Sequence, residues 1–292
     1  MQMVFLDFVI QLLTFGLSLG MLYFLLASGF SLIFGLMGVF NYAHGSLFMV
    51  GGYLCFVVTQ QTGNFWLGLL AAAVGVGVLG LILEKTLIKK LKGNIMNQII
   101  LTFGLIYVFD EVVKLIFGNR PYMQPAPPAL RGGVEILTQF VPRYRLFMIV
   151  AGFVILLALV LLFNKTRLGL IIRAGIEHPE MVRSIGVNIQ TVFTITFALG
   201  CLLAGLGGGI ALPFMGVYPN LGPDQIFNAI AVIIIGGFGN ILWSFYAATI
   251  LGLMQYTVGL LVPVLAMPAT LLLMLTVLMI RPYGLFAGGE NK

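Results

Sequence analysis

Very few side chains in this chain have the chemistry or the spacing of a reaction centre. Its only two histidines, His44 and His178, lie on different segments, and no His-Glu-x-x-His pattern supplies metal ligands. No Gly-Lys pair occurs, so the phosphate loop that cradles ATP is absent. The letters GVGVLG at 75–80 match a dinucleotide fingerprint, but they lie inside an apolar run rather than between a strand and a helix. We therefore expect no enzyme activity, no metal and no cofactor on this chain.

Polar side chains and helix-breaking glycines gather instead at two places within apolar sequence. The first is NYAHGSLFMVGGY at 41–53, where we expect Asn41 to cap a helix that begins inside a membrane. The free N–H groups at such a helix start attract anions such as a carboxylate. The second is GGFGN at 236–240, whose composition favours irregular backbone. Interrupted helices in corresponding places indicate a transport path. The alternative is that Asn41 and His44 merely hydrogen-bond a neighbouring helix.

One charged cluster, Asp110, Glu111 and Lys114, falls near the end of an apolar run. Asp110 and Lys114 are spaced i,i+4, so they could pair on one helix face. A proton-coupled carrier would need a carboxylate nearer the bilayer centre. We interpret the cluster as paired and snorkelling at the membrane interface.

The composition places the chain in a membrane. Of 292 residues, 60% are hydrophobic and 8% are charged, whereas about a quarter are charged in soluble domains. Long apolar runs predict eight transmembrane helices, at 8–34, 43–59, 65–83, 95–117, 146–163, 189–212, 242–262 and 264–280. A ninth apolar piece, 226–238, is shorter than the roughly 20 residues that cross a bilayer, so it either crosses at a tilt or re-enters. We predict a single all-α polytopic membrane domain over 1–292.

The distribution of Lys and Arg predicts the orientation. Two loops of equal parity carry most of these residues and should face the cytoplasm. They contain Lys85, Lys89, Lys90 and Lys92 in the first loop, and Lys165, Arg167, Arg173 and Arg183 in the second, 164–189. The loop 118–145 should then be external, although it does not follow the rule, because it holds Arg120, Arg131, Arg143 and Arg145. Its Pro- and Gly-rich sequence predicts extended or turning backbone. Arg281 also prefers the cytoplasm, which requires 226–238 to cross fully.

The second cytoplasmic loop contains the signature of a short helix. Pro179 suits the first helical position, and Gly186 suits the left-handed residue that ends a helix. About two turns would then carry Met181, Val182 and Ile185 on one side. Such a stripe either docks on a partner surface or packs back on the chain's own spans.

Five motifs in order resemble one family: NYAHGSLFMVGGY, RAGIEHPEMVRSIGVN, GCLLAGLGGGIALP, IGGFGN and RPYGLF. Together they resemble the LivH-type permease of branched-chain amino acid ABC importers. The resemblance implies a second related permease subunit, two cytoplasmic ATPase subunits that bind ATP and Mg, and a periplasmic substrate-binding protein. It implies a translocation path at Asn41, Tyr42, His44, Gly45, Ser46, Gly236, Gly237, Gly239 and Asn240. It also implies ATPase coupling through Arg173, Ala174, Glu177, Met181, Val182, Ile185 and Gly186.

The expected function is therefore transport across a bacterial inner membrane. The chain should form the path of an ATP-driven importer for branched-chain or similar hydrophobic amino acids, with no role in nucleic-acid binding. One departure from the family pattern is NILWSFYAA at 240–248, where bulky residues follow the glycine break. Related permeases for urea and short amides share most of the motifs, so that substrate class stays open. A third alternative is an ion-coupled carrier that works alone.

Overall fold

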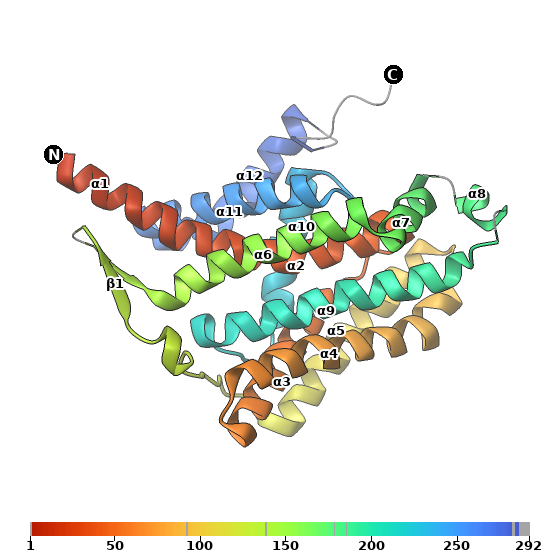
Figure 1. Ribbon diagram of the computed structural model, residues 1–292, viewed down its shortest axis with the longest axis horizontal. Coiled ribbons are helices and arrows are strands. Elements are labelled where there is room, and N and C mark those ends of the chain that lie inside the picture. The colour runs from red at the N-terminus through yellow and green to blue at the C-terminus, as the bar shows by residue number, and fades with distance from the viewer. Residues whose placement is uncertain are drawn as a thin grey trace.

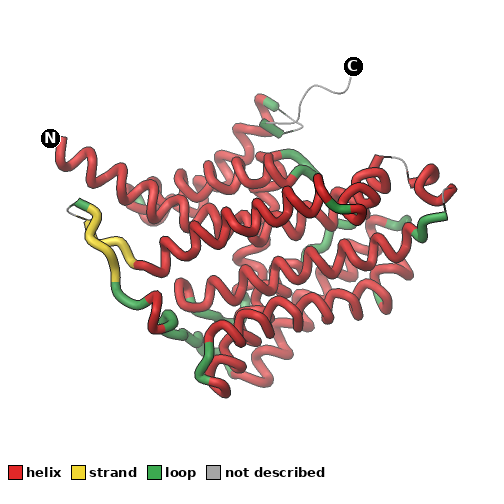
Figure 2. Tube along the Cα trace, viewed as in Figure 1, coloured by secondary structure: helices red, strands yellow, loops and turns green. Residues whose placement is uncertain are grey.

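The computed structural model describes residues 2–91, 93–137, 139–177, 179–184, 186–281 and 284–285. Helices make up most of these residues, as Figure 2 shows. The α-helices are α1 (Gln2–Gln11), α2 (Leu17–Met37), α3 (His44–Thr62), α4 (Phe65–Thr86), α5 (Ile95–Phe117), α6 (Arg143–Lys165), α7 (Arg167–Glu177), α8 (Pro179–Ser184), α9 (Ile189–Met215), α10 (Leu221–Gly236), α11 (Ile241–Leu261) and α12 (Ala266–Ile280). Short helical turns are η1 (Leu12–Gly16), η2 (Ile88–Leu91), η3 (Pro128–Leu130) and η4 (Pro263–Leu265).

Each of the eight predicted spans coincides with a helix, and the all-α class is confirmed. Among the described residues, six helices are long and apolar enough to cross a membrane: Leu6–Gly35, Phe65–Thr86, Arg143–Lys165, Ile189–Met215, Ile241–Leu261 and Pro263–Ile280. The first joins α1 and α2 through the π-helical turn η1. Helices α3 and α5 are not among the six; α3 starts with polar residues, and α5 carries Asp110, Glu111 and Lys114. The total of eight stays a prediction.

Helix α9 is the centre of the bundle and packs against α4, α3 and α2. Its small residues allow this, because helices in lipid associate through close backbone contact. A Cβ added to Gly200 would lie 2.6 Å from the carbonyl oxygen of Gly29, and one added to Gly51 would lie 2.5 Å from Gly205. Glycines on these helices therefore serve helix packing. Figure 1 shows α2, α6 and α9 running along the long axis of the molecule.

A two-stranded antiparallel hairpin, which the sequence analysis did not predict, lies at one end of the bundle. Strand β1 (Gly133–Ile136) pairs with β2 (Gln139–Pro142) in the register Gly133↔Pro142 and Ile136↔Gln139. In Figure 1 it lies beside the N-terminal helix α1, and Gln11 donates to the side-chain carbonyl of Gln139 at 2.6 Å. The preceding residues are mostly irregular, as predicted, and meet the end of α9 through the isolated bridge Tyr122↔Val217.

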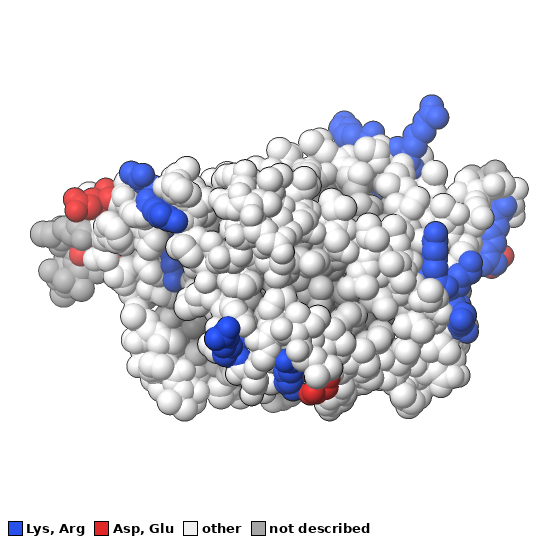
Figure 3. Space-filling model, turned by 90° about the horizontal axis from the view of Figure 1, so that it is seen from below, with Lys and Arg blue, Asp and Glu red and all other residues white. Residues whose placement is uncertain are grey.

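Local contacts occupy three of the arginines that resisted the orientation rule. Arg145 stacks between the rings of Phe15 and Phe214, 4.1 and 4.7 Å from their centroids, and donates to Ser18 Oγ at 3.1 Å. Arg120 donates to Tyr122, and Arg131 donates to a backbone carbonyl. Arg145 thus ties the end of loop 118–145 to the bundle, whereas the contacts of Arg120 and Arg131 lie within the loop. On the face drawn in Figure 3, Lys, Arg, Asp and Glu lie towards the ends and along the edges, and a broad central surface carries none.

Helix α10 begins and ends against opposite ends of its neighbours. Near its start, the backbone N–H of Asn220 donates to Asp110 on the last third of α5 at 3.1 Å. Just beyond its end, Gly239 contacts Gly35 close to the C-terminus of α2. A re-entrant segment would return to the side from which it started, so this path supports the crossing alternative. The N–H of Leu285 donates to the carbonyl of Ile235 at 2.8 Å. Arg281 and the C-terminus of α12 therefore lie at the same end of the bundle as the C-terminus of α10.

Candidate functional site

The first helix break follows α2 and is a turn rather than a side-chain cap. Gly38 ends α2 with φ +64°, and α3 begins at His44 after Ala43. The expectation that Asn41 caps α3 is wrong, because Ala43 occupies the cap position and no side chain caps the helix. Asn41 instead accepts the N–H of His44 at its backbone carbonyl, 3.0 Å away, because residues 42–43 form a turn. The Asn41 residue is buried.

His44 is fully buried between α2 and the break. Its Nε2 lies 3.2 Å from the carbonyl oxygen of Leu26, and its ring stacks on Phe30 with centroids 5.6 Å apart. Within the described part of the chain, Nδ1 has no hydrogen-bond partner. His44 thus makes the hydrogen bond to a neighbouring helix that we predicted as the alternative to a role in the transport path. Tyr42 packs on Phe103 of α5, with ring centroids 4.4 Å apart.

The next two residues of the first break contact the start of α10. A Cβ added to Gly45 would meet the carbonyl oxygen of Gly222, and one added to Gly222 would lie 2.7 Å from the Cα of Ser46. Ser46 is fully buried, and its hydroxyl makes no hydrogen bond in the described structure. The small residues at 45 and 222 therefore let α3 and α10 touch backbone to backbone.

The second break, between α10 and α11, has the irregular backbone that its composition predicts. Gly236 ends α10, and Gly237 and Gly239 have φ values of +95° and +78°, which favour glycine. Asn240 caps α11, because its side chain accepts the N–H of Trp243 at 3.2 Å. Its backbone carbonyl also accepts the Ser244 hydroxyl at 2.8 Å. We expected an asparagine side chain to cap the helix after the first break, and of the two breaks only the second is followed by such a cap, at Asn240.

Within the described residues, the start of α3 and the second break lie far apart. The start of α3 meets α10 at Gly222, and the second break lies beyond Gly236, about 21 Å further along the helix axis at 1.5 Å per residue. A row of aromatic rings joins them along α2. Neighbouring centroids in this row are 4.6–5.6 Å apart, in the order His44, Phe30, Phe40, Phe34 and Phe238. The breaks are therefore coupled by packed rings.

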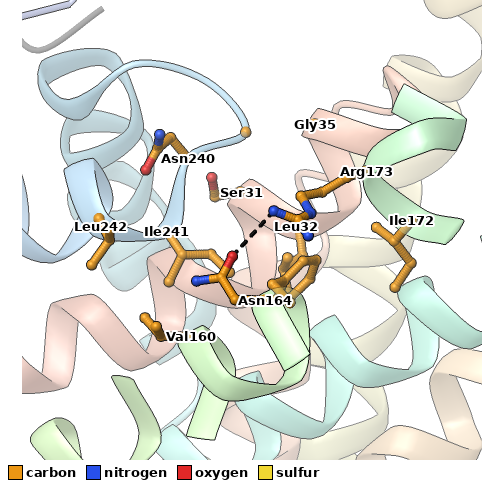
Figure 4. A pocket seen from close by; sticks show the side chains of 12 residues that line it. Ser31, Leu32, Gly35, Val160, Asn164, Ile172, Arg173, Asn240, Ile241 and Leu242 are labelled. Carbon is orange, nitrogen blue, oxygen red and sulfur yellow. Dashed lines mark hydrogen bonds between the residues drawn. The ribbon is translucent and has the colours of Figure 1, made fainter. Parts of the chain in front are cut away.

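A cavity of about 230 Å³ lies beside the second break. It is formed by the C-terminal part of α2, the end of α6, α7 and the start of α11, as Figure 4 shows. The lining residues are Ser31, Leu32, Gly35, Val160, Phe163, Asn164, Ile172, Arg173, Gly239, Asn240, Ile241 and Leu242. Arg173 donates to the side-chain carbonyl of Asn164 at 3.1 Å. Two sets of predicted residues thus share one cavity: Gly239 and Asn240 from the path, and Arg173 from the coupling loop.

Loop 164–189 contains two helices, whereas its sequence predicts one. Helix α7 was missed and carries Arg173 and the half-buried Ala174. Helix α8 starts at the predicted Pro179. Gly186 has φ +82°, and the bonds Gly186 N–H to Arg183 and Val187 N–H to Val182 complete a Schellman ending, so its predicted role is confirmed.

The expected apolar stripe on α8 does not face one way. Val182 is 3% exposed and belongs to the core, whereas Met181 is 65% exposed. The prediction that Val182 docks on a partner is therefore wrong, because Val182 packs against its own chain. Met181 is the apolar residue of α8 that faces outward. Ile185 lies outside the described residues, and the side chain of Glu177 is not described either.

A buried carboxylate near the same end was not predicted as a site residue. Glu84 at the end of α4 is 0% exposed and accepts two hydrogen bonds from the start of α9, from Gln190 Nε2 at 3.0 Å and from Thr194 Oγ1 at 2.7 Å. Its position in the last turn of an apolar span was the available signal. The other missed residues, Ser31 and Asn164, belong to different helices, and only folding brings them together.

The charged cluster on α5 pairs differently from the prediction. Lys114 bridges to Glu111 at 2.8 Å, an i,i+3 pair, rather than to Asp110. Asp110 is buried and accepts the N–H of Asn220. Nearby, Tyr218 in the loop before α10 donates to Asp224 at 2.9 Å. Burial, and then this hydrogen bond, raises the pKa of Tyr218 to about 12.

An all-α bundle whose described residues include six helices long and apolar enough to cross a membrane, with interrupted helices among them, is typical of a membrane permease. A profile of the family described as "Branched-chain amino acid transport system / permease component" matches residues 12–281, and the chain belongs to this family.

Curated relatives bear names of the same kind. The chain is 26% identical over 256 residues to the high-affinity branched-chain amino acid transport system permease protein LivH of Escherichia coli K12, covering 82% of each chain. It is 24% identical over 260 residues to BraD of Pseudomonas aeruginosa, covering 84% and 85%. It is 27% identical over 291 residues to the probable permease LivH of Methanocaldococcus jannaschii, covering 89% and 87%.

One solved structure shares the fold. PsaBC from Streptococcus pneumoniae, in complex with Fab, aligns with a TM-score of 0.51 at 14% identity, covering 96% of this chain and 95% of that one. At this identity the likeness concerns the fold alone.

Proposed function

We propose that this chain is the membrane-spanning permease subunit of an ATP-driven importer for branched-chain or similar hydrophobic amino acids in a bacterial inner membrane. It pairs with a second related permease and receives substrate from a periplasmic binding protein. Two cytoplasmic ATPase subunits bind ATP and Mg, and this chain binds no cofactor of its own. The family assignment and the branched-chain transport names of the relatives support this proposal.

The observation that carries the proposal is the cavity shared by Arg173 and Asn240. Arg173 belongs to α7 in the cytoplasmic loop, and Asn240 starts α11 at the second break. A partner that moves α7 and α8 would therefore move one wall of a space whose other wall is the break. Alternating access in transporters works by such rigid-body movement of one part against another.

The exposed Met181 supports a partner at the cytoplasmic end. It is apolar, outward-facing and located on a helix of six residues, which is too short to be stable alone in water. A contact surface on an ATPase subunit would cover it, in the manner of a helix in a groove.

Reconstitution tests the function directly. The chain is purified with its co-expressed partners, placed in liposomes and supplied with binding protein, radiolabelled leucine and ATP. We expect leucine uptake that needs both ATP and the ATPase subunits. The chain alone, without nucleotide, should move no leucine, and rapid flux from that preparation would overturn the proposal.

The same liposomes separate the alternatives. A permease for urea or short amides would transport [¹⁴C]urea or acetamide in preference to leucine. An ion-coupled carrier would transport without ATPase subunits when a proton or sodium gradient is imposed. The relatives' printed names refer to branched-chain amino acids, which favours the leucine arm.

A further inference from the structure

We infer that the cavity beside the second break binds the carboxylate of the transported amino acid and holds its aliphatic side chain against an apolar wall. This inference rests on the proposed function and identifies where the permease contacts its substrate at the cytoplasmic end.

Positive electrostatic groups converge on the cavity from two elements. Arg173 presents its guanidinium from α7, held by Asn164 at 3.1 Å. The start of α11, a helix of 21 residues, presents its first N–H groups from the opposite wall. Asn240 caps only the N–H of Trp243, and in the described structure the N–H groups of Ile241 and Leu242 donate no hydrogen bond. Free amides at a helix start, together with an arginine, form a site for a carboxylate.

A buried hydroxyl without a partner provides an independent sign of a ligand. Ser31 on α2 is 0% exposed and lines the cavity, yet its Oγ makes no hydrogen bond within the described part of the chain. Figure 4 shows Ser31 between Asn240 and Arg173. Buried polar groups in native structures are almost always hydrogen-bonded, so an unpaired one needs a partner from outside the chain. A carboxylate oxygen between Arg173 and the start of α11 would accept this hydroxyl.

The rest of the lining favours a small aliphatic molecule. Its apolar wall consists of Leu32, Val160, Phe163, Ile172, Ile241 and Leu242. The volume of about 230 Å³ is below the range of roughly 300–1,000 Å³ typical of pockets for drug-sized ligands. A phospholipid would also bring an anionic group, but its two acyl chains would not fit in this space. We therefore favour the substrate over lipid.

Among the described residues no carboxylate lines the cavity, so the ammonium group of an amino acid finds no ionic partner in this lining. The ammonium should point towards the open side, where Asn164 and Asn240 are exposed. The site should consequently recognise leucine through its carboxylate and side chain. Leucinamide, which lacks the carboxylate, should bind poorly, and 4-methylpentanoate, which lacks the ammonium, should bind well.

The test uses thiol labelling in the assembled transporter. Ser31→Cys is reacted with the anionic sulfonatoethyl methanethiosulfonate and with the cationic trimethylammonioethyl reagent. Relative to a free thiol in solution, we expect the ratio of the anionic to the cationic reaction rate to be about ten-fold higher or more, since a cleft of one charge sign concentrates the opposite ion. Arg173→Gln in the same background should remove most of this preference. Leucine and 4-methylpentanoate should slow the labelling, whereas leucinamide should not.

Matched controls accompany this experiment. The native Cys55 and Cys201 are buried and do not line the cavity, so the unsubstituted chain should label slowly. Ser28→Cys lies one turn away on α2, equally buried but not in the cavity lining, and should show neither preference nor protection. If Ser31→Cys fails to assemble, Leu242→Cys at the exposed edge of the same cavity replaces it.

Several outcomes would overturn the inference. A rate ratio equal to that of the free thiol would exclude an anion site. Equal protection by leucine and leucinamide would exclude carboxylate recognition, and protection by inorganic phosphate or phosphatidylglycerol but not leucine would assign the site to phosphate groups. ATP-driven leucine uptake by the unsubstituted complex is measured in parallel. Uptake without protection defeats only the cavity inference, and protection without ATP-dependent uptake defeats only the proposed function.

Discussion

Gly35 on α2 and Gly239 in the second break lie so close together that a Cβ built on Gly35 would be 2.6 Å from the Cα of Gly239. Gly239 has φ +78°, a conformation that favours glycine. A displacement of Gly239 away from Gly35 would therefore change the backbone of the second break. The contact joins the end of α2 to the segment that starts α11. It also forms one side of the cavity that Arg173 and Asn240 share.

Gly35→Ala should therefore impair transport by forcing these two segments apart. We expect a loss of stability of about 1–3 kcal/mol, the usual cost of overpacking, together with reduced ATP-dependent leucine uptake. Thermal unfolding in detergent and the liposome assay measure the two effects. Gly104→Ala is the matched control, because a Cβ there meets nothing within 4 Å, and it should be neutral or stabilising. Equal behaviour of the two variants would contradict the role of the contact.

Met181→Asp should uncouple ATP hydrolysis from transport while leaving the subunit folded. Met181 is exposed, so the substitution removes an apolar contact with the partner and no contact within the core of the subunit. The measurement is substrate-stimulated ATPase activity of the assembled transporter. Met123→Asp, an equally exposed methionine in loop 118–145, is the control and should leave the stimulation unchanged. Normal stimulation in Met181→Asp would remove this residue from the proposed ATPase interface.

Val182→Asp should behave differently from Met181→Asp. Val182 is buried, so a carboxylate there is placed in the core and should reduce the amount of folded subunit recovered from membranes. Yield and thermal stability measure this effect. A stable, well-inserted Val182→Asp subunit would show that the packing of α8 against the bundle is dispensable.

Glu84→Ala should destabilise the contact between α4 and α9. Removing the carboxylate leaves the side chains of Gln190 and Thr194 without their acceptor, at a cost on the order of 1–3 kcal/mol. A lowered midpoint of thermal unfolding is the expected result. Thr86→Ala, an exposed residue two positions along, should have little effect. An unchanged midpoint for Glu84→Ala would mean that water satisfies the two donors equally well.

Arg145→Lys should lower stability despite keeping the charge. Arg145 stacks on Phe15 and Phe214 and donates to Ser18, and a lysine does not reproduce the planar stacking. We expect a loss of about 1–2 kcal/mol. Arg143→Lys, exposed and two residues earlier, is the control. Equal stability of the two variants would show that the stacking of Arg145 on Phe15 and Phe214 does not stabilise the fold.

The local sequence predicted those features that depend on short stretches of chain. Hydropathy located all the long helices, because the cost of burying polar groups in lipid acts on each run of about 20 residues. Glycine content located the second break, since φ values of +95° and +78° are properties of single residues. Pro179 and Gly186 bounded α8 for the same local reason.

Features that depend on several segments were decided only by folding. Asn41 and Asn240 are equally good caps by residue type, but only Asn240 caps its helix, because the turn at 42–43 separates Asn41 from the start of α3. The burial of Val182 and exposure of Met181 depend on how α8 rests on the bundle. The cavity combines Ser31, Asn164, Arg173 and Asn240, which come from four elements.

The sequence by itself thus determined that this chain is an all-α membrane protein with interrupted helices, because hydropathy and backbone preference are written residue by residue. The tertiary structure alone decided which polar groups share a cavity, because packing across α2, α6, α7 and α11 joins residues far apart in the chain. The unpaired hydroxyl of Ser31 is visible as unpaired only when all of its neighbours are in place.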